Sequence, residues 1–196
     1  MPDTYDQGKD LTGFWTAVLQ GDTKAYAVIH GHLHPELYRY AFAMLNAEEL
    51  AEDAVQEVFI RIWYRKEKIG TLNSVRAFFF TAVRRQALNQ LRGLRSLQIL
   101  PPGEPDIAFS PEDILIAQED QQERKRQLSR YLNQLPARQR EVIYLRFYEE
   151  LPYTEIAEIM QVNYQSVINL AHKAITQLRG LMGHIPLWWL VFVYLP

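Results

Sequence analysis

Residues 135–179 constrain the fold more than any other part of this 196-residue chain. Pro136 suits a first helical turn, where its missing N–H costs nothing, and an apolar helical segment follows it. Pro152 then breaks the chain before two further segments, which are joined by a three-residue turn at 161–163. Apolar residues recur in these segments at helical spacing: Ile156, Ala157 and Met160, then Val167, Leu170, Ala171, Ala174 and Leu178. The pattern predicts a helix-turn-helix behind a supporting helix, with Asn163 as the N-cap of the last helix.

The other face of that last helix is polar. It contains Gln165, Ser166, Asn169, His172 and Lys173. Amide side chains can hydrogen-bond adenine edges in a major groove, and Lys173 can reach phosphates or guanine. The pattern alone leaves two interpretations open, a DNA-contacting helix and a bundle helix with a solvated face.

Length, charge and cysteine content narrow the possible functions. The chain has room for two small domains, each with its own core. Its net charge is −2, so a nucleic-acid surface must come from local clustering of cations. Without Cys there is no disulfide and no thiolate metal site, which fits a reducing compartment. The start, MPDTYDQGKDLTGF, lacks the layout of a signal peptide, so we expect a cytoplasmic protein.

Helical spacing also dominates the first half of the chain. We expect helices over residues 11–20, 22–31, 34–46, 48–66 and 74–91, and therefore an all-α fold. Asp22 and Ser74 are predicted N-caps, and His34-Pro35 is predicted to break one helix from the next. In segment 48–66 the acids precede the bases, which suits the helix dipole. The same acids leave open a second interpretation, an acidic surface for a basic partner.

Cations cluster just after that segment. Between residues 61 and 92 the charged residues are Arg61, Arg65, Lys66, Lys68, Arg76, Arg84, Arg85 and Arg92, against the single acid Glu67. This excess of cations lies beside aromatic residues. It favours a surface that contacts nucleic-acid phosphates over a helix surface that is only solvated.

Proline marks a boundary in the middle of the chain. Pro101, Pro102, Pro105 and Pro111 cannot continue a helix, so we expect a Pro-rich linker. The predicted division is a first domain at 1–94, a linker at 95–112, a helix-turn-helix domain at 113–182 and an apolar tail at 183–196. The tail, ending in IPLWWLVFVYLP, has about half the length of a membrane-spanning helix. It is expected to dock on the protein itself or on a partner, with peripheral membrane contact as an alternative.

Taken together, these segments resemble the extracytoplasmic-function (ECF) sigma factors, small bacterial transcription-initiation subunits of the sigma-70 family. The resemblance rests on AEDAVQEVFIRIW at 51–63, SVRAFFFTAVRRQALNQLR at 74–92, LPARQREV at 135–142 and YTEIAEIM at 153–160. It implies that the first domain docks on the clamp helices of core RNA polymerase through Asp53, Gln56 and Glu57.

The resemblance also implies two contacts with promoter DNA. The first domain would open the downstream (−10) element, using Lys66, Lys68, Asn73, Arg76, Arg84 and Arg85. The helix-turn-helix would recognise the upstream (−35) element through the polar face given above. The implied partners are core RNA polymerase, promoter DNA and an anti-sigma factor, with no enzymatic activity, cofactor or small-molecule substrate.

The chain departs from the family pattern at four places. Pro152 stands where a capping Ser is usual, so we expect the cap from elsewhere, with Thr154 as the candidate. Gln161 replaces a Gly common in the turn. Ile168 and Asn169 stand where Lys or Arg is usual, and Arg85 replaces an Asn. The base contacts of the family therefore cannot be transferred unchanged.

Two other functions compete with this interpretation. One is a stand-alone helix-turn-helix regulator that needs no polymerase-docking domain. The other is a metal-dependent hydrolase built on His30, His32 and His34, which in an extended segment would share one side. We expect these histidines to be structural and predict no metal site, because no Cys, nucleophile or paired catalytic carboxylates accompany them.

Overall fold

The computed structural model describes residues 11–97, 107–109 and 122–182, and these contain eight α-helices and no strand. The all-α prediction is therefore confirmed for this part of the chain. The helices form two compact units, which divide between Gln90 and Leu91 near the end of the fourth helix, and the short stretch Ala43–Asn46 groups with the second unit. The tail at 183–196 and most of the Pro-rich segment lie outside the described residues.

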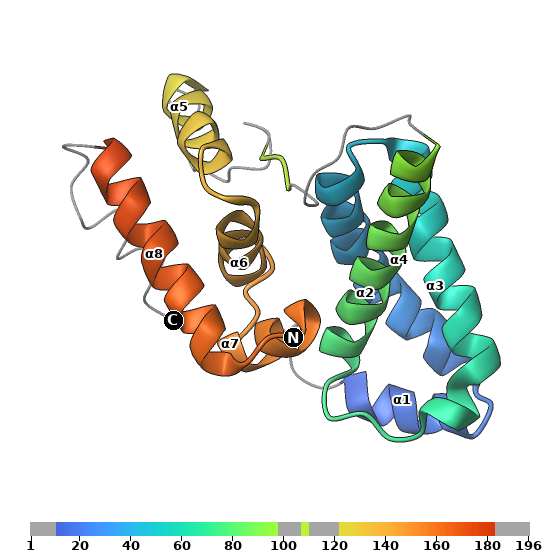
Figure 1. Cartoon of the computed structure of the whole chain (residues 1–196). Coiled ribbons are helices and arrows are strands. Elements are labelled where there is room, and N and C mark those ends of the chain that lie inside the picture. Colours follow the sequence, from blue (N-terminus) through green and yellow to red (C-terminus); the bar gives the residue numbers. More distant parts are fainter. Residues whose placement is uncertain (1–10, 98–106, 110–121, 183–196) are drawn as a thin grey trace. The chain divides into compact units, whose positions relative to one another are not determined.

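The first unit consists of four helices, shown in blue to green in Figure 1: α1 (Leu11–Leu19), α2 (Thr23–Leu45), α3 (Glu48–Ile69) and α4 (Val75–Ser96). Two of them begin at the predicted caps. Asp22 Oδ1 accepts hydrogen bonds from the backbone N–H groups of Lys24 and Ala25, at 2.8 and 3.1 Å. Ser74 Oγ accepts one from Ala77 N at 3.1 Å. Both caps are confirmed, and each satisfies an N–H that a helix start leaves unpaired.

The break predicted at His34-Pro35 is wrong, because α2 continues through Pro35. Proline in a helix interior costs about 3 kcal/mol, as it loses one hydrogen bond and crowds the preceding turn. Leu33, Leu37 and Tyr40, on both sides of that position, are at most 2% exposed. Burying each such side chain contributes about 1.5–3 kcal/mol. Tertiary packing therefore outweighs the local penalty.

An aromatic core joins the helices of the first unit. The Phe59 ring on α3 lies 5.0 Å from that of Phe79 on α4 and 6.0 Å from that of Tyr26 on α2. Trp15, from α1, meets Phe79 edge to face with centroids 6.4 Å apart. Its indole N–H also donates a 2.8 Å hydrogen bond to the carbonyl of Gly70, the C-cap of α3. A fully buried side chain thus holds the start of the loop between α3 and α4.

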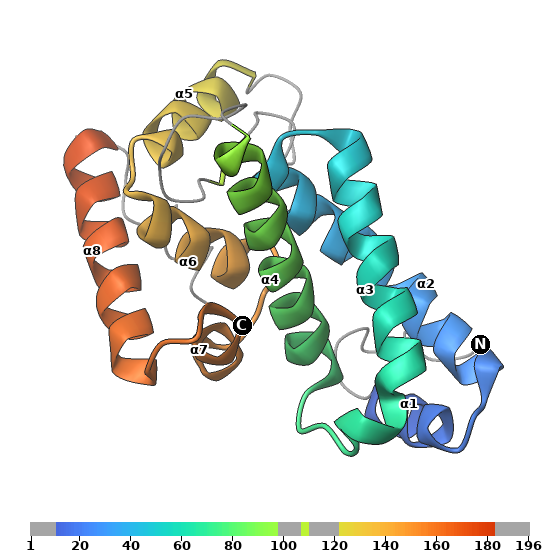
Figure 2. The same ribbon diagram turned by 45° about the vertical axis from the view of Figure 1, so that its right-hand side comes forward.

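The second unit is the predicted helix-turn-helix with its supporting helices: α5 (Gln122–Asn133), α6 (Ala137–Phe147), α7 (Tyr153–Met160) and α8 (Tyr164–Met182). Helix α8 packs against the other three, and Figure 2 shows α6 and α7 beside it. Its buried side contains four of the predicted positions, Val167, Ala171, Ala174 and Leu178. Asn163 Oδ1 accepts a 2.7 Å hydrogen bond from Ser166 N, which confirms the predicted cap.

Helix α7 lacks a side-chain cap. Pro152 itself occupies the N-cap position and makes no capping hydrogen bond, while Thr154 lies inside the helix. The expectation that Thr154 supplies the cap is therefore wrong. Pro152 is tolerated because it has no N–H to satisfy, and its carbonyl still accepts a helical hydrogen bond from Ile156 N at 3.0 Å.

Candidate functional site

Helix α3 exposes the three residues expected to contact polymerase. Asp53, Gln56 and Glu57 are all exposed, whereas Ala54, Val55 and Val58 on the other side are buried. At 3.6 residues per turn, positions 53, 56 and 57 fall within about 100° of one another. They therefore form one polar stripe along the outside of the helix.

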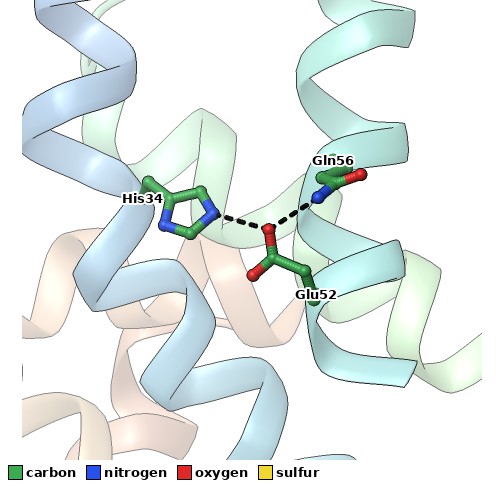
Figure 3. Close-up of polar contacts among 3 residues, drawn as sticks. All are labelled: His34, Glu52 and Gln56. Atoms are coloured by element: carbon green, nitrogen blue, oxygen red, sulfur yellow. Dashed lines mark hydrogen bonds and ion pairs between the residues drawn. The ribbon is translucent and has the colours of Figure 1, made fainter. Parts of the chain in front are cut away.

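One end of this stripe belongs to a polar cluster with α2. Gln56 Nε2 donates a 2.7 Å hydrogen bond to Glu52 Oε1, and His34 Nε2 lies 3.2 Å from the same oxygen (Figure 3). The Gln56 hydrogen bond is the largest cause that lowers the pKa of Glu52, and His34 acts in the same direction. Glu52 therefore stays ionised, and Gln56 is held on the outer face of α3.

The other end of the stripe is tied to α4 by Gln86, a buried residue that sequence reasoning missed. Its Nε2 donates to Glu57 Oε2, and its Oε1 accepts a 3.2 Å hydrogen bond from Arg61 Nη1. Arg61 also lies 3.7 Å from Glu57. The side-chain amide of Gln86 thus holds Glu57 through its nitrogen and Arg61 through its oxygen. One carboxylate oxygen of Glu57 therefore faces α4.

The three histidines lie in α2, so the extended arrangement considered for a metal site does not occur. His30 and His34 share one face, with ring centroids 4.9 Å apart, and His32 falls on another. Among residues 11–97, 107–109 and 122–182, no group of three or more His, Cys, Asp or Glu side chains could hold a metal ion.

The first unit is expected to lose stability as the pH falls below about 6.5, the ordinary pKa of histidine. Burial, and next the neighbouring His34, lower the pKa of His30, although Glu52 opposes the shift. A group whose pKa is lower in the folded state contributes stability above its unfolded pKa and loses it as the pH falls through the folded value. Thermal unfolding of a His30→Gln variant should show a flatter pH profile. An unchanged slope would contradict this role for His30.

The six residues expected to contact the −10 element lie on the end of α3, the following loop and α4. Lys68, Asn73 and Arg85 are exposed. Lys66 packs over the Trp63 ring, with its Nζ 4.0 Å from the centroid. Arg84 is half-buried.

Arg76 forms an ion pair inside the first unit. Its Nε donates to Glu36 Oε2 at 2.8 Å, and its guanidinium lies 5.4 Å from the centre of the Phe80 ring. The bond joins α4 to α2 across 40 positions of sequence, which explains why charge clustering alone could not reveal it.

Helix α8 presents its predicted polar face to solvent. Gln165, Asn169, His172 and Lys173 are exposed and Ser166 is half-buried. Gln165 Nε2 donates a 3.2 Å hydrogen bond to Asn169 Oδ1, four residues later on the helix. This pair leaves one N–H and the oxygen of Gln165 and both N–H groups of Asn169 for other partners, so both side chains can still recognise base edges.

The turn before α8 contains an unfavourable residue. Gln161 has φ 55° and ψ 46°, the left-handed conformation that glycine adopts without steric cost. Gln161→Gly is therefore expected to raise the free energy of unfolding of the second unit by about 1 kcal/mol. Gln177→Gly, at an exposed helical position, should lower it by about as much. Chemical denaturation of both variants checks this, and a destabilised Gln161→Gly would contradict it.

No helix in the part of the chain that the structure describes is long and apolar enough to cross a membrane. The apolar segment singled out in the sequence lies outside that part, so its expected docking stays a prediction.

Comparison with known families matches both units. Residues 29–96 match sigma-70 region 2, and residues 125–178 match sigma-70 region 4. The ECF RNA polymerase sigma factor SigL of Mycobacterium tuberculosis is 29% identical over 168 residues, covering 83% of this chain and 94% of that protein. RNA polymerase sigma factor SigV of Bacillus subtilis is 26% identical over 144 residues, covering 74% and 82%.

Two solved structures share the fold. CnrH, in complex with the cytosolic domain of CnrY, has a TM-score of 0.63 at 17% identity and covers 88% of this chain and 97% of its own. The sigma factor RpoE of Bartonella quintana, in complex with the anti-sigma factor NepR, has a TM-score of 0.63 at 23% identity, with coverages of 84% and 100%.

The region 2 match over α2 to α4 decides between the alternatives. A stand-alone helix-turn-helix regulator or a histidine-based hydrolase would have no use for a polymerase-binding unit of this kind. The chain therefore belongs to the ECF sigma factors of the sigma-70 family, non-enzymatic subunits that bind core RNA polymerase and promoter DNA to initiate transcription.

Proposed function

We propose that the exposed stripe of Asp53, Gln56 and Glu57 on α3 is the contact with the clamp helices of core RNA polymerase. This stripe is the observation on which the proposal rests. Gln56 and Glu57 are each held by a second residue, Glu52 and Gln86, so little side-chain freedom remains to be lost on binding. A rigid polar stripe suits a complementary basic surface.

The loop at residues 70–74 and helix α4 then open the −10 element and hold its non-template strand. Lys66, Lys68, Asn73, Arg84 and Arg85 supply cations and an amide around the loop, which can track a single-stranded backbone. Trp15 holds the loop at Gly70, and a loop of fixed position can receive an extruded base. Arg76, paired with Glu36, serves here by orienting α4.

The helix-turn-helix recognises the −35 element as duplex. Helix α8 enters the major groove with Gln165, Asn169 and Lys173 nearest the bases, and with Ser166 and His172 toward the phosphates. Because this face has few cations, its own affinity for DNA is weak. Docking of the first unit on polymerase raises the local concentration of the second at the promoter and compensates for that weakness.

The domain division proposed for this activity is 1–94, a Pro-rich tether at 95–112, 113–182 and the tail at 183–196. The protein acts in the cytoplasm, where promoter DNA is accessible. An anti-sigma factor holds it inactive, by analogy with the complex of RpoE and NepR. The apolar tail is a second candidate restraint, and it is testable by comparing transcription before and after deletion of residues 183–196.

Transcription with purified core polymerase on a randomised promoter library tests the proposal. Recovered promoters should share two elements, and the protein should bind core enzyme in the absence of DNA. If the protein directs no initiation and binds no core enzyme, the proposed function fails. A chain lacking α5 to α8 serves as the control, because it should keep core binding and lose selection of the upstream element.

A further inference from the structure

The first two turns of α8 carry no charge. Residues 164–171 include no Lys, Arg, His, Asp or Glu. Lys or Arg bound to the O6 and N7 atoms of guanine is the commonest specific contact in a major groove. Because the first Lys or Arg of the helix is Lys173, the start of α8 lacks the usual means of recognising guanine.

Two apolar side chains lie at the edge of the polar face. Tyr164 is 51% exposed, and Ile168, one turn later, is half-buried. Their spacing places them on one side of the helix, about 40° apart around its axis. Within the part of the chain that the structure describes, the Tyr164 side chain makes no hydrogen bond, ion pair or ring contact. Tyr164 and Ile168 therefore form an apolar strip that solvent can reach.

The amide pair of α8 lies directly beside this apolar strip. Gln165 and Asn169 each follow one member of the strip in the sequence, so each is turned by about 100° from it around the helix axis. Their 3.2 Å hydrogen bond holds the two amides together along the helix. The start of α8 thus offers apolar contact and amide hydrogen bonding on adjoining sides.

An A·T base pair matches this combination of side chains. In the major groove, adenine presents an acceptor and a donor, and thymine presents the methyl group on its C5 atom. An amide pairs with the adenine edge, while an apolar side chain packs against the methyl group. In helix-turn-helix proteins the N-terminal residues of the recognition helix contact the base edges. The apolar strip and the amide pair occupy that end of α8.

We propose that Tyr164 and Ile168 determine specificity by contacting thymine methyl groups, so that the start of α8 selects A·T base pairs in the upstream element. The inference rests on the proposed function, since it requires α8 to lie in the major groove of that element. It gives a role to Ile168, which stands where Lys or Arg is usual in the family. Lys173, farther along the helix, remains the residue that can reach a phosphate or guanine.

Replacing thymine by uracil in the upstream element tests the contact, because it removes the methyl group and keeps the hydrogen bonds of the base pair. Binding is measured for the protein assembled with core RNA polymerase, on a promoter recovered from the randomised library. Loss of one buried methyl group should lower the affinity of the wild type about fourfold for each contacted thymine. Uracil placed between the two elements is the control and should change nothing. Equal binding of the thymine and uracil forms of the upstream element would overturn the proposal.

Protein variants assign the effect to individual side chains. Tyr164→Ala and Ile168→Ala should each reduce the uracil penalty to about twofold or less, because the side chain that packs on a methyl group is gone. Thr176→Ala is the matched control, since Thr176 is also exposed on α8 and lies about 18 Å along the helix from Tyr164. This control should keep the full penalty. A penalty that persists unchanged in both Tyr164→Ala and Ile168→Ala would overturn the proposal.

Ile168→Lys is expected to change which base is selected. Lysine can bind the O6 and N7 atoms of guanine, so promoters recovered with this variant should be enriched about tenfold in guanine at one position where the wild type selects an A·T pair. Stronger binding of all promoters with the wild-type base preference would indicate a phosphate contact at residue 168 and would overturn the proposal.

A measurement without polymerase separates this inference from the proposed function. If the wild type directs no initiation with core RNA polymerase, the proposed function fails. The full-length protein alone is then measured at low salt on two pools of random duplexes, one made with thymine and one with uracil. A preference for the thymine pool that is lost in Tyr164→Ala and Ile168→Ala would support the contact. Equal binding of the two pools by the wild type would overturn it.

Discussion

Replacing Asp53 by Lys is expected to weaken binding to core RNA polymerase by about a hundredfold, because it places a like charge against a basic partner surface. The unfolding temperature should not change, since Asp53 is exposed on α3 and lies away from the buried side of the helix. Asp53 is a better choice than Glu57 for this test. Removing Glu57 would leave the buried Nε2 of Gln86 without its acceptor and would mix a folding defect with a binding defect.

The matched control for Asp53→Lys is Glu48→Lys. Glu48 is an exposed acid on the same helix, five positions earlier and roughly 140° around the helix axis. Glu48→Lys produces the same change in net charge as Asp53→Lys, but outside the stripe. Affinity for core enzyme, measured by fluorescence anisotropy of the labelled full-length protein, should fall for Asp53→Lys alone. Equal losses in both variants would show a general charge effect and would refute the stripe as the contact.

Trp15→Ala is expected to destabilise the first unit by about 3–5 kcal/mol, the usual cost of emptying a buried aromatic site. Trp15→Phe separates this packing role from the hydrogen bond to Gly70. It keeps a ring beside Phe79 and loses the donor, so it should cost about 1–2 kcal/mol. Because Gly70 begins the loop proposed to hold the melted strand, promoter opening by Trp15→Phe should slow by about threefold to tenfold.

Opening can be followed with a fluorescent base in the non-template strand, under conditions where the variant remains folded. Phe14→Ala is the control for the neighbouring position, because Phe14 is 41% exposed and makes neither contact. If the Trp15→Phe protein opens the promoter at the wild-type rate despite its lower stability, the hydrogen bond from Trp15 to Gly70 does not contribute to promoter opening.

The helices and their starts could be predicted from sequence because they depend on local rules. Asp22, Ser74 and Asn163 each precede an apolar helical pattern, and each caps the helix that follows. The continuity of α2 could not be predicted in this way. Pro35 signals a break locally, and only the burial of residues on both sides of it reverses that signal.

The exposed residues of the candidate site were also predictable, since a polar face follows from periodicity. The contacts that hold these residues in place could not be predicted from sequence. Gln86 meets Glu57 across 29 positions, and His34 meets Glu52 across 18. Neither of these pairs has a local signature, and each depends on how two helices come together. Sequence patterns therefore show which residues are exposed on the binding surface, and the tertiary structure shows which of these side chains are held by other residues.

The indole of Trp15 also provides an intrinsic fluorescence probe of the first unit. An indole that is buried and hydrogen-bonded to a backbone carbonyl emits at a shorter wavelength than one in water, and Trp15 is 1% exposed. Trp63 is the other tryptophan among the described residues and also lies in the first unit, whereas Trp188 and Trp189 lie outside those residues. Emission is therefore assigned to Trp15 in a variant that carries Phe at positions 63, 188 and 189. Loosening of the loop at Gly70 during promoter opening would be visible in this emission without any attached dye.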